Sequence, residues 1–167
     1  TWYAIASSPT PDSLCLSLGV ALNDQIFLIG GRGDTATNHV WGYNIAASTW
    51  IRQPDFPSKH YGGVALTVGT SVYAGLGRNA NGTFNRNLWR TIDMGTWIPE
   101  TVCSLATGGI LAGTTYHSKL YLIDESFTIL EYDPATRTWT RRAQLPADFR
   151  GIHCMFTMND LIYIGLS

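Results

Sequence analysis

Side chains with binding chemistry gather in short polar segments between the apolar runs of the sequence. The candidate binding residues are cationic, amide, acidic and aromatic: Arg32 and Asp34; Lys59, His60 and Tyr61; Arg78, Asn79, Asn81, Asn85 and Arg86; Asp124 and Glu125; Arg150 and His153. Guanidinium groups pair with carboxylates, and amides both donate and accept hydrogen bonds. This set therefore suits recognition of a protein segment or a glycan. The alternative, that any one of these residues is only a solvated loop residue, stays open.

No reactive motif accompanies these residues. The sequence has no G-x-S-x-G, no phosphate-binding Walker loop, and no metal-ligand spacing among His39, His60, His117 and His153. The cysteines Cys15, Cys103 and Cys154 form no C-x-x-C pair, and we expect buried free thiols. We therefore predict no catalytic residue, no metal and no cofactor. A Ser–His–Asp set stays open, because such groups meet in space and not in sequence.

Composition narrows the class of partner. Only 14% of the 167 residues are charged, the formal net charge is −1, and the Lys and Arg residues are scattered. Nucleic-acid binding needs a concentrated basic stripe, so we expect none. No apolar run approaches the roughly 20 residues of a membrane-spanning helix, so we expect no membrane insertion. The low charge and the many Thr, Asn and Gly residues favour an extracellular or cell-surface location.

The elements that must position the candidate residues follow from an internal repeat. One marker is the tryptophan series Trp2, Trp50, Trp97 and Trp139, with spacings of 48, 47 and 42 residues. A second marker is the aromatic series Phe27, Tyr73, Tyr121 and Tyr163, with spacings of 46, 48 and 42 residues. Two independent markers with nearly one period indicate repeated structural units that cover the whole chain.

Each unit reads as four short strands. In the first unit, residues 19–22 and 25–29 flank the turn-forming pair Asn23-Asp24, and residues 39–45 and 49–53 follow. No segment has a helical apolar period, so we expect an all-β protein. Such sheets bury both faces by packing radially, as in a β-propeller, with the tryptophans buried on the outer strands and each indole N–H paired. The Gly63-Val64-Ala65-Leu66 segment repeats residues 19–22.

The repeat resembles the kelch motif. The matching residues are Gly30-Gly31, Tyr43 and Trp50 in one unit, and the segment from Tyr132-Asp133-Pro134 to Trp139 with Leu145-Pro146 in another. The second unit has Gly75-Leu76-Gly77 and the third has Ile123-Asp124 where the family has paired glycines. The resemblance implies a kelch-type β-propeller.

The resemblance also sets the expected domain organisation. We expect a single domain over residues 1–167, with complete four-stranded blades at 17–53, 62–100 and 108–142. Residues 2–6 and 152–166 would be parts of a split or flanking blade. Kelch propellers usually have six or seven blades, so we expect a partial propeller. A missing segment or another chain would complete the ring, because unpaired sheet faces adhere.

The leading functional hypothesis is an interaction module that presents loops at one end of the ring to a protein or glycan ligand. The loops from second to third strands and the returns between blades should share that end, and residues 77–87, the longest and richest in Asn and Arg, are the first candidate. The Asn81-Gly82-Thr83 sequon lies in this loop. The resemblance leaves two alternatives: a sugar-processing enzyme similar to sialic acid mutarotases or copper radical oxidases, and a structural component of an extracellular assembly.

Overall fold

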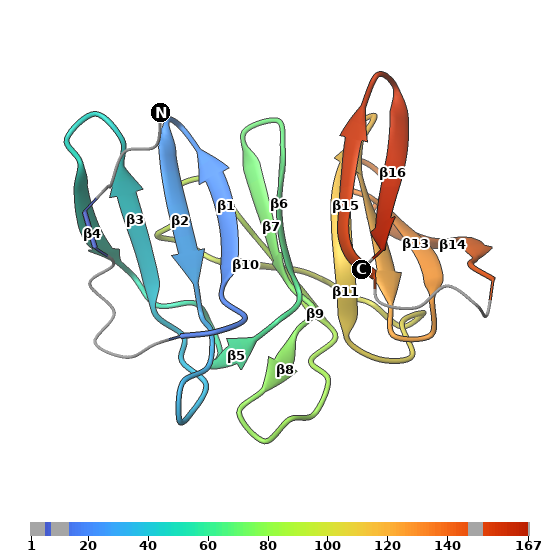
Figure 1. The fold of residues 1–167 in the computed structure, drawn as a ribbon, viewed down its shortest axis with the longest axis horizontal. Helices are drawn as coiled ribbons and strands as arrows, with labels where there is room; N and C mark the ends of the chain where they lie inside the picture. Colours follow the sequence, from blue (N-terminus) through green and yellow to red (C-terminus); the bar gives the residue numbers. More distant parts are fainter. Residues whose placement is uncertain (1–5, 8–13, 147–151, 167) are drawn as a thin grey trace.

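The computed structural model describes residues 6–7, 14–146 and 152–166, and every element in them is a β-strand (Figure 1). The predicted outer strand at residues 2–6 falls outside the described residues except for Ala6. No helix in the described part of the chain is long and apolar enough to cross a membrane. The expected all-β class is confirmed.

Three four-stranded antiparallel sheets and one two-stranded sheet follow one another along the chain. The first contains β1 (Leu18–Leu22), β2 (Gln25–Ile29), β3 (Val40–Asn44) and β4 (Thr49–Gln53). The second contains β6 (Val64–Val68), β7 (Ser71–Gly75), β9 (Asn87–Thr91) and β10 (Ile98–Val102). The third contains β11 (Ile110–Tyr116), β12 (Lys119–Asp124), β13 (Thr128–Asp133) and β14 (Thr138–Gln144), and β15 (Ile152–Met158) pairs with β16 (Leu161–Leu166). A short ribbon joins β5 (His60–Tyr61) to β8 (Arg78–Asn79).

The hairpin between the first two strands of a sheet depends on residues that accept positive φ. Asn23 and Asn159 have φ of 49° and 50°, and Asp24 and Asp160 follow at 57° and 59°. Two consecutive positive φ angles give the turn whose twist matches antiparallel strands, and Asn and Asp tolerate that conformation. His117 begins the corresponding turn of the third sheet with φ of 46°. The predicted turn at Asn23-Asp24 is therefore confirmed.

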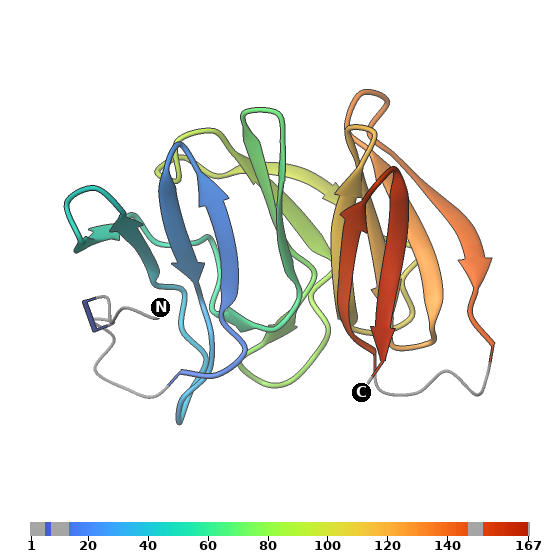
Figure 2. The same ribbon diagram turned by 45° about the horizontal axis from the view of Figure 1, so that its top comes forward.

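The sheets stand side by side like radial slices (Figures 1 and 2). Their first strands β1, β6, β11 and β15 contact one another in turn, while the fourth strands β4 and β14 lie at opposite outer sides of the molecule in Figure 1. This arrangement places the first strands around a common axis and the fourth strands at the rim. It is the β-propeller geometry that the repeat predicts.

The core lies between neighbouring sheets. We call the face that a sheet turns to the next sheet along the chain its leading face, and the opposite side its trailing face. Between the first and second sheets, Phe27 and Ile29 of the leading face pack with Val72 and Ala74 of the trailing face. The gap between the second and third sheets is filled in the same way by Tyr73, Leu88, Leu122 and Tyr132. The gap between the third sheet and the β15–β16 sheet is filled by Ile123, Met155, Ile162 and Ile164.

Two sequence expectations about buried groups are wrong. Trp50, Trp97 and Trp139 are half-buried rather than buried. The Trp50 Nε1 donates to the Ala6 carbonyl at 3.1 Å, but the indole N–H groups of Trp97 and Trp139 have no hydrogen-bond partner in the described protein. Packing against Phe56, whose ring lies 4.8 Å from that of Trp97, places that indole without satisfying its N–H.

The cysteines also differ from expectation. All three are free, but only Cys103 is buried, and burial raises the pKa of its thiol. Cys15 and Cys154 are exposed, and the Cys15 thiol donates to the Arg32 carbonyl at 3.2 Å.

Candidate functional site

The loops that carry the candidate residues meet at one end of the sheets, the lower end in Figure 1. The return between the first and second sheets forms β5, the loop between β7 and β9 forms β8, and these two segments pair as His60↔Asn79 and Tyr61↔Arg78. An isolated bridge between Thr37 and His60 attaches the loop between β2 and β3. Three separate segments of the chain thus become one surface. The ribbon could not be predicted from the sequence, because two-residue strands carry no alternation pattern.

Two side-chain pairs lie across this end, and the backbone pairing of Tyr61 with Arg78 joins them. We call these four residues the loop-end row: Arg32, Tyr61, Arg78 and Glu125. The Arg32 guanidinium donates to the Tyr61 hydroxyl at 3.1 Å and lies over its ring, 4.9 Å from the centroid. The Arg78 guanidinium donates to the Gly82 carbonyl at 2.9 Å and forms an ion pair with Glu125 of the third sheet. The row therefore connects loops of all three four-stranded sheets.

The amide residues of the long loop bind mainly to one another. Asn85 donates to the Asn79 side chain at 3.0 Å, and Asn79 donates to the Thr83 hydroxyl at 3.0 Å. The Asn81 side-chain oxygen accepts from the Thr83 backbone N–H and hydroxyl. These bonds give the loop a defined shape, with Asn81 exposed at its tip. The sequon is accordingly at the surface.

Three candidate residues are buried at this end: Tyr61 within the row, and His60 and Asp124 beneath it. The His60 ring packs against that of Phe56, with centroids 4.4 Å apart and planes tilted by 48°. Its Nδ1 lies 3.2 Å from the Ser58 carbonyl oxygen, and its Nε2 is buried without a partner among the described residues. Burial lowers the pKa of His60 and keeps the ring neutral. A neutral, enclosed imidazole of this kind supports the fold of the loop.

Asp124 occupies the place that a glycine of the kelch pair occupies in the first sheet. Its carboxylate accepts from the Ser126 and Thr128 backbone N–H groups, both at 3.0 Å, and from the Thr107 backbone N–H at 3.0 Å. Burial alone would raise the pKa of Asp124, but these and the Ser126 hydroxyl bonds outweigh it and lower the pKa. The residue holds two loops together and has no accessible carboxylate face, since it is fully buried.

The other candidates are more dispersed. Asp34, Lys59 and Arg86 are exposed, and the Arg86 guanidinium lies 5.6 Å from the Phe84 ring centroid. Arg150 lies outside the described residues. His153 lies in β15, which belongs to the two-stranded sheet.

A groove of about 370 Å³ runs along the axis between the first strands. Its walls are mainly small or apolar, and include Ser17, Gly19, Ala65, Gly113 and Cys154. Apart from Cys154, the lining residues have no titratable side chain. In the described part of the chain, no three His, Cys, Asp or Glu side chains are grouped to hold a metal ion.

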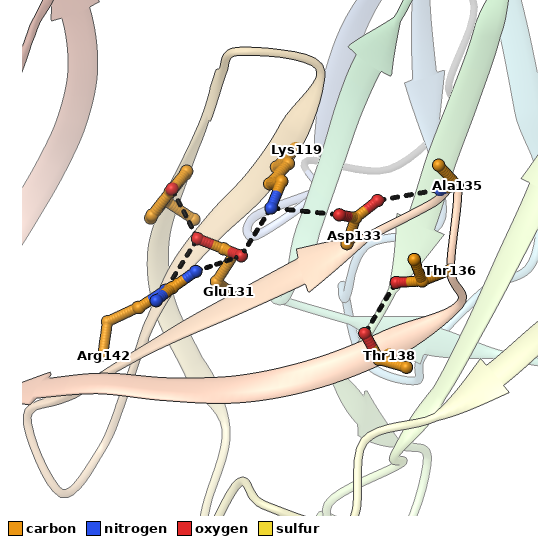
Figure 3. Close-up of polar contacts among 8 residues, drawn as sticks. Lys119, Glu131, Asp133, Ala135, Thr136, Thr138 and Arg142 are labelled. Carbon is orange, nitrogen blue, oxygen red and sulfur yellow. Dashed lines mark hydrogen bonds and ion pairs between the residues drawn. The ribbon is translucent and has the colours of Figure 1, made fainter.

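A buried carboxylate lies away from the loop end, on the leading face of the third sheet (Figure 3). Glu131 accepts from Lys119 Nζ at 3.0 Å, from the Tyr121 hydroxyl at 2.5 Å, and from the Arg142 Nε and Nη2 atoms at 2.8 and 2.7 Å. Lys119 also pairs with Asp133 at 3.0 Å. The Arg142 bonds are the main cause that lowers the pKa of Glu131 to about 2. Both carboxylate oxygens are engaged, so the cluster stabilises the sheet rather than binding a ligand.

The second sheet contains the same cross-strand ion pair with the charges exchanged. Glu100 and Arg142 are both the extra residue of a β-bulge in the fourth strand. Glu100 pairs with Arg90 of the third strand at 3.4 Å, at the position where Arg142 pairs with Glu131. The third sheet also contributes to Glu100, through the Tyr132 hydroxyl at 2.7 Å and Arg137 at 3.3 Å.

Comparisons with known proteins agree with this geometry. The family model of the kelch motif matches residues 14–57. The kelch repeat protein M-T8 of Myxoma virus (strain Lausanne) is 33% identical over 63 residues, which are 37% of this chain and 12% of that protein.

The solved structure of YjhT superimposes with a TM-score of 0.82 at 16% identity, over 96% of this chain and 60% of that one. The chain thus spans about three fifths of that structure and a small part of the viral protein. The superposition shows the fold, and the motif match shows the repeat type. Residues 14–57 therefore carry a kelch motif, and the sheets are arranged as the blades of a kelch-type β-propeller.

Proposed function

We propose that this chain is a binding module that holds an acidic segment of a partner protein on its loop end. The observation that carries the proposal is the loop-end row, in which Arg32 and Arg78 are positioned by loops of different blades. Among the candidate charged residues that reach solvent here, Arg32, Lys59, Arg78 and Arg86 are cations, while Asp34 and Glu125 are carboxylates. An excess of guanidinium groups favours a ligand with carboxylates.

An acidic glycan is the second candidate ligand. The amide side chains of Asn79, Asn81 and Asn85 line the same loop and suit sugar hydroxyl groups. The two ligands differ in what they require of the surface. A peptide depends mainly on charge pairing with the arginines, whereas a sugar depends also on directional hydrogen bonds from the exposed Asn81 amide.

Fluorescence anisotropy tests the proposal directly. The probes are a labelled Glu-rich peptide, a Lys-rich peptide of equal length and a sulfated oligosaccharide. We expect the Glu-rich peptide to bind and the double variant Arg32→Ala/Arg78→Ala to weaken binding at least about tenfold. Arg141→Ala, an exposed arginine on β14, is the matched control and should bind as the wild type does.

Two outcomes would decide against the peptide. Equal binding by the wild type and the double variant would remove the loop-end row as the site. Binding of the oligosaccharide alone, with loss in Asn81→Ala, would replace the peptide by a glycan.

We also propose an extracellular or cell-surface location, supported by the low charged content of 14%. Expression of the natural protein followed by fractionation of cells and medium tests this. Recovery in the cytosolic fraction alone would contradict it.

A further inference from the structure

Glu125 is the one carboxylate in the loop-end row, and it lies where the first two blades have a glycine. Counted from the aromatic third residue of each second strand, Glu125 corresponds to Gly31 and Gly77. A Cβ at Gly31 would lie 2.2 Å from a hydroxyl oxygen, and one at Gly77 would lie 2.3 Å from a carbonyl oxygen. The first two blades therefore have no room for a side chain at this position.

The third blade makes room for this side chain on the opposing segment. Gly108 and Gly109 face Glu125, whose backbone N–H donates to the Gly109 carbonyl at 3.0 Å. A Cβ at Gly108 would lie 2.5 Å from the Glu125 Oε2 atom, and one at Gly109 would lie 2.9 Å from Oε1. Because these two residues have no side chain, the carboxylate can lie against their backbone and reach Arg78. A departure of this kind from the repeat is expected where a residue has a functional role.

The two arginines of the loop-end row differ in the N–H groups that they leave for a ligand. The Arg78 Nη1 donates to the Gly82 carbonyl at 2.9 Å and its Nη2 donates to Glu125, so only its Nε has no partner among the described residues. The Arg32 Nη1 donates to the Tyr61 hydroxyl, whereas its Nε and Nη2 have no partner in the same part of the chain. Arg32 can therefore form a two-bond pair with a ligand carboxylate as it stands, but Arg78 can do so only after Glu125 leaves.

The Glu125 carboxylate is able to leave, because only its backbone is held firmly. Arg78 is the only side chain in the described part of the chain that pairs with this carboxylate. The two side chains are 41% and 35% exposed, and an ion pair in such contact with solvent shifts an equilibrium by up to about fivefold. A ligand that brings its own carboxylate can compete with a pair of that strength.

We propose that Glu125 is a built-in competitor of the acidic ligand: it occupies Arg78 in the free protein and must leave before a ligand carboxylate can pair with that arginine. This inference rests on the proposed function of the loop-end row. Only molecules in which Arg78 is vacant can form the full contact, so the apparent dissociation constant rises as that fraction falls. Glu125 thereby limits the affinity of the loop-end row for acidic segments.

Fluorescence anisotropy with the labelled Glu-rich peptide, at low ionic strength and with the whole 167-residue chain, tests this role of Glu125. Glu125→Gln removes the charge that pairs with Arg78 and should lower the dissociation constant about two- to fivefold. Gly108→Ala keeps the carboxylate but displaces it from its place against the backbone, so it is the second variant and should act in the same direction.

Asp55→Asn is the matched control. It removes the same charge from an ion pair with Arg52, which lies outside the loop-end row and has side chains of similar exposure, 47% for Asp55 and 33% for Arg52. This substitution should leave the dissociation constant of the peptide unchanged.

A double-mutant cycle identifies the arginine through which Glu125 acts. In Arg78→Ala, Glu125→Gln should change the dissociation constant by less than about 1.5-fold, whereas in Arg32→Ala the gain should remain. A dissociation constant that is not lowered by Glu125→Gln, or a gain that persists in Arg78→Ala, would overturn the competitor role and leave the proposed function intact. Absence of peptide binding in the wild type and in every variant would remove both. Circular dichroism verifies that each variant is folded.

Discussion

Replacement of Glu131 by Gln isolates the contribution of the buried carboxylate on the third blade. The substitution keeps the side-chain volume but removes the charge that faces Lys119 and Arg142. The pKa of Glu131 falls from 4.5 to about 2, and such a shift corresponds to about 3 kcal/mol of unfolding free energy at neutral pH. The Glu131 side chain is 3% exposed but that of Arg142 is 49% exposed, so solvent screening reduces the expected loss to about 2 kcal/mol.

The sign of the pH dependence follows from the lowered pKa. A carboxyl group with a lower pKa in the folded state stabilises that state above its unfolded pKa near 4.5. The stabilisation is lost as the pH falls toward about 2, because the unfolded chain binds the proton first. The difference in unfolding free energy between the wild type and Glu131→Gln should therefore fall by more than half between pH 7 and pH 3.

Urea unfolding followed by tryptophan fluorescence at both pH values measures this difference. Glu125→Gln is the matched control, because that carboxylate also pairs with an arginine of comparable exposure but is itself 41% exposed. It should lose less than about 1 kcal/mol. Two results would refute this role of the Glu131 carboxylate. One is unfolding of Glu131→Gln at the wild-type urea concentration at pH 7, and the other is an equal loss of unfolding free energy at both pH values.

Three further predictions concern the loop end. Gly77→Ala should lower the unfolding free energy in a urea titration by about 2 kcal/mol or more, because a Cβ there would lie 2.3 Å from the Gly62 carbonyl oxygen. Gly19→Ala is the control: a Cβ there meets nothing within 4 Å, so this substitution should change the unfolding free energy little. Burial lowers the pKa of His60, so the unfolded chain binds a proton first as the pH falls. The unfolding free energy of the wild type should therefore decrease below about pH 6.5, by up to about 1.4 kcal/mol per pH unit. His60→Phe should abolish this decrease. His117→Gln, at an exposed turn, should keep that slope. Asp124→Asn should lower the melting temperature by several degrees, because an amide cannot accept all the hydrogen bonds that the carboxylate accepts. An unchanged melting temperature would argue against the role of Asp124 in joining two loops.

The architecture was predictable because the packing between blades repeats the same residue types. The aromatic series Phe27, Tyr73 and Tyr121 marks the leading face of successive sheets, and the structure places each on the third residue of a second strand. An aromatic residue that recurs at one period therefore indicates the packing contact that each sheet makes with the next. The likeness of residues 63–66 to residues 19–22 is offset by two positions from the structural match, since the hairpins align Leu22 with Val68.

The failed expectations concern interactions that depend on a partner in space. The replacement of the glycine pair by Asp124 was visible in the sequence, but the N–H groups that donate to its carboxylate come from Thr107 and Thr128 on two other segments. No sequence pattern marks Phe56, which lies in a segment with two prolines, yet it packs beside Trp97, whose indole N–H has no partner among the described residues. Periodicity indicates which side of a strand is buried and gives no information about which polar atom lies opposite.

Most candidate binding residues that the structure describes lie on loops at one end of the sheets, but the sequence could not separate surface residues from buried supports. Arg32 and Arg78 reach the surface and pair across loops, whereas His60 and Asp124 lie beneath it. The difference arises from the β5–β8 ribbon, which turns Tyr61 toward Arg32 and encloses His60. The assignment of a ligand to this surface stays a prediction.

The exchanged charges of the two bulge pairs bear on how a chain of near-identical repeats assembles correctly. If β9 paired by mistake with β14, Arg90 would face Arg142, and if β13 paired with β10, Glu131 would face Glu100. Like charges opposite each other destabilise a pair of strands, so both errors are penalised while the correct hairpins are favoured. Repeat proteins are prone to such misassembly. The opposite order of charge in the second and third blades therefore distinguishes the outer hairpins of these two blades from each other while the chain folds.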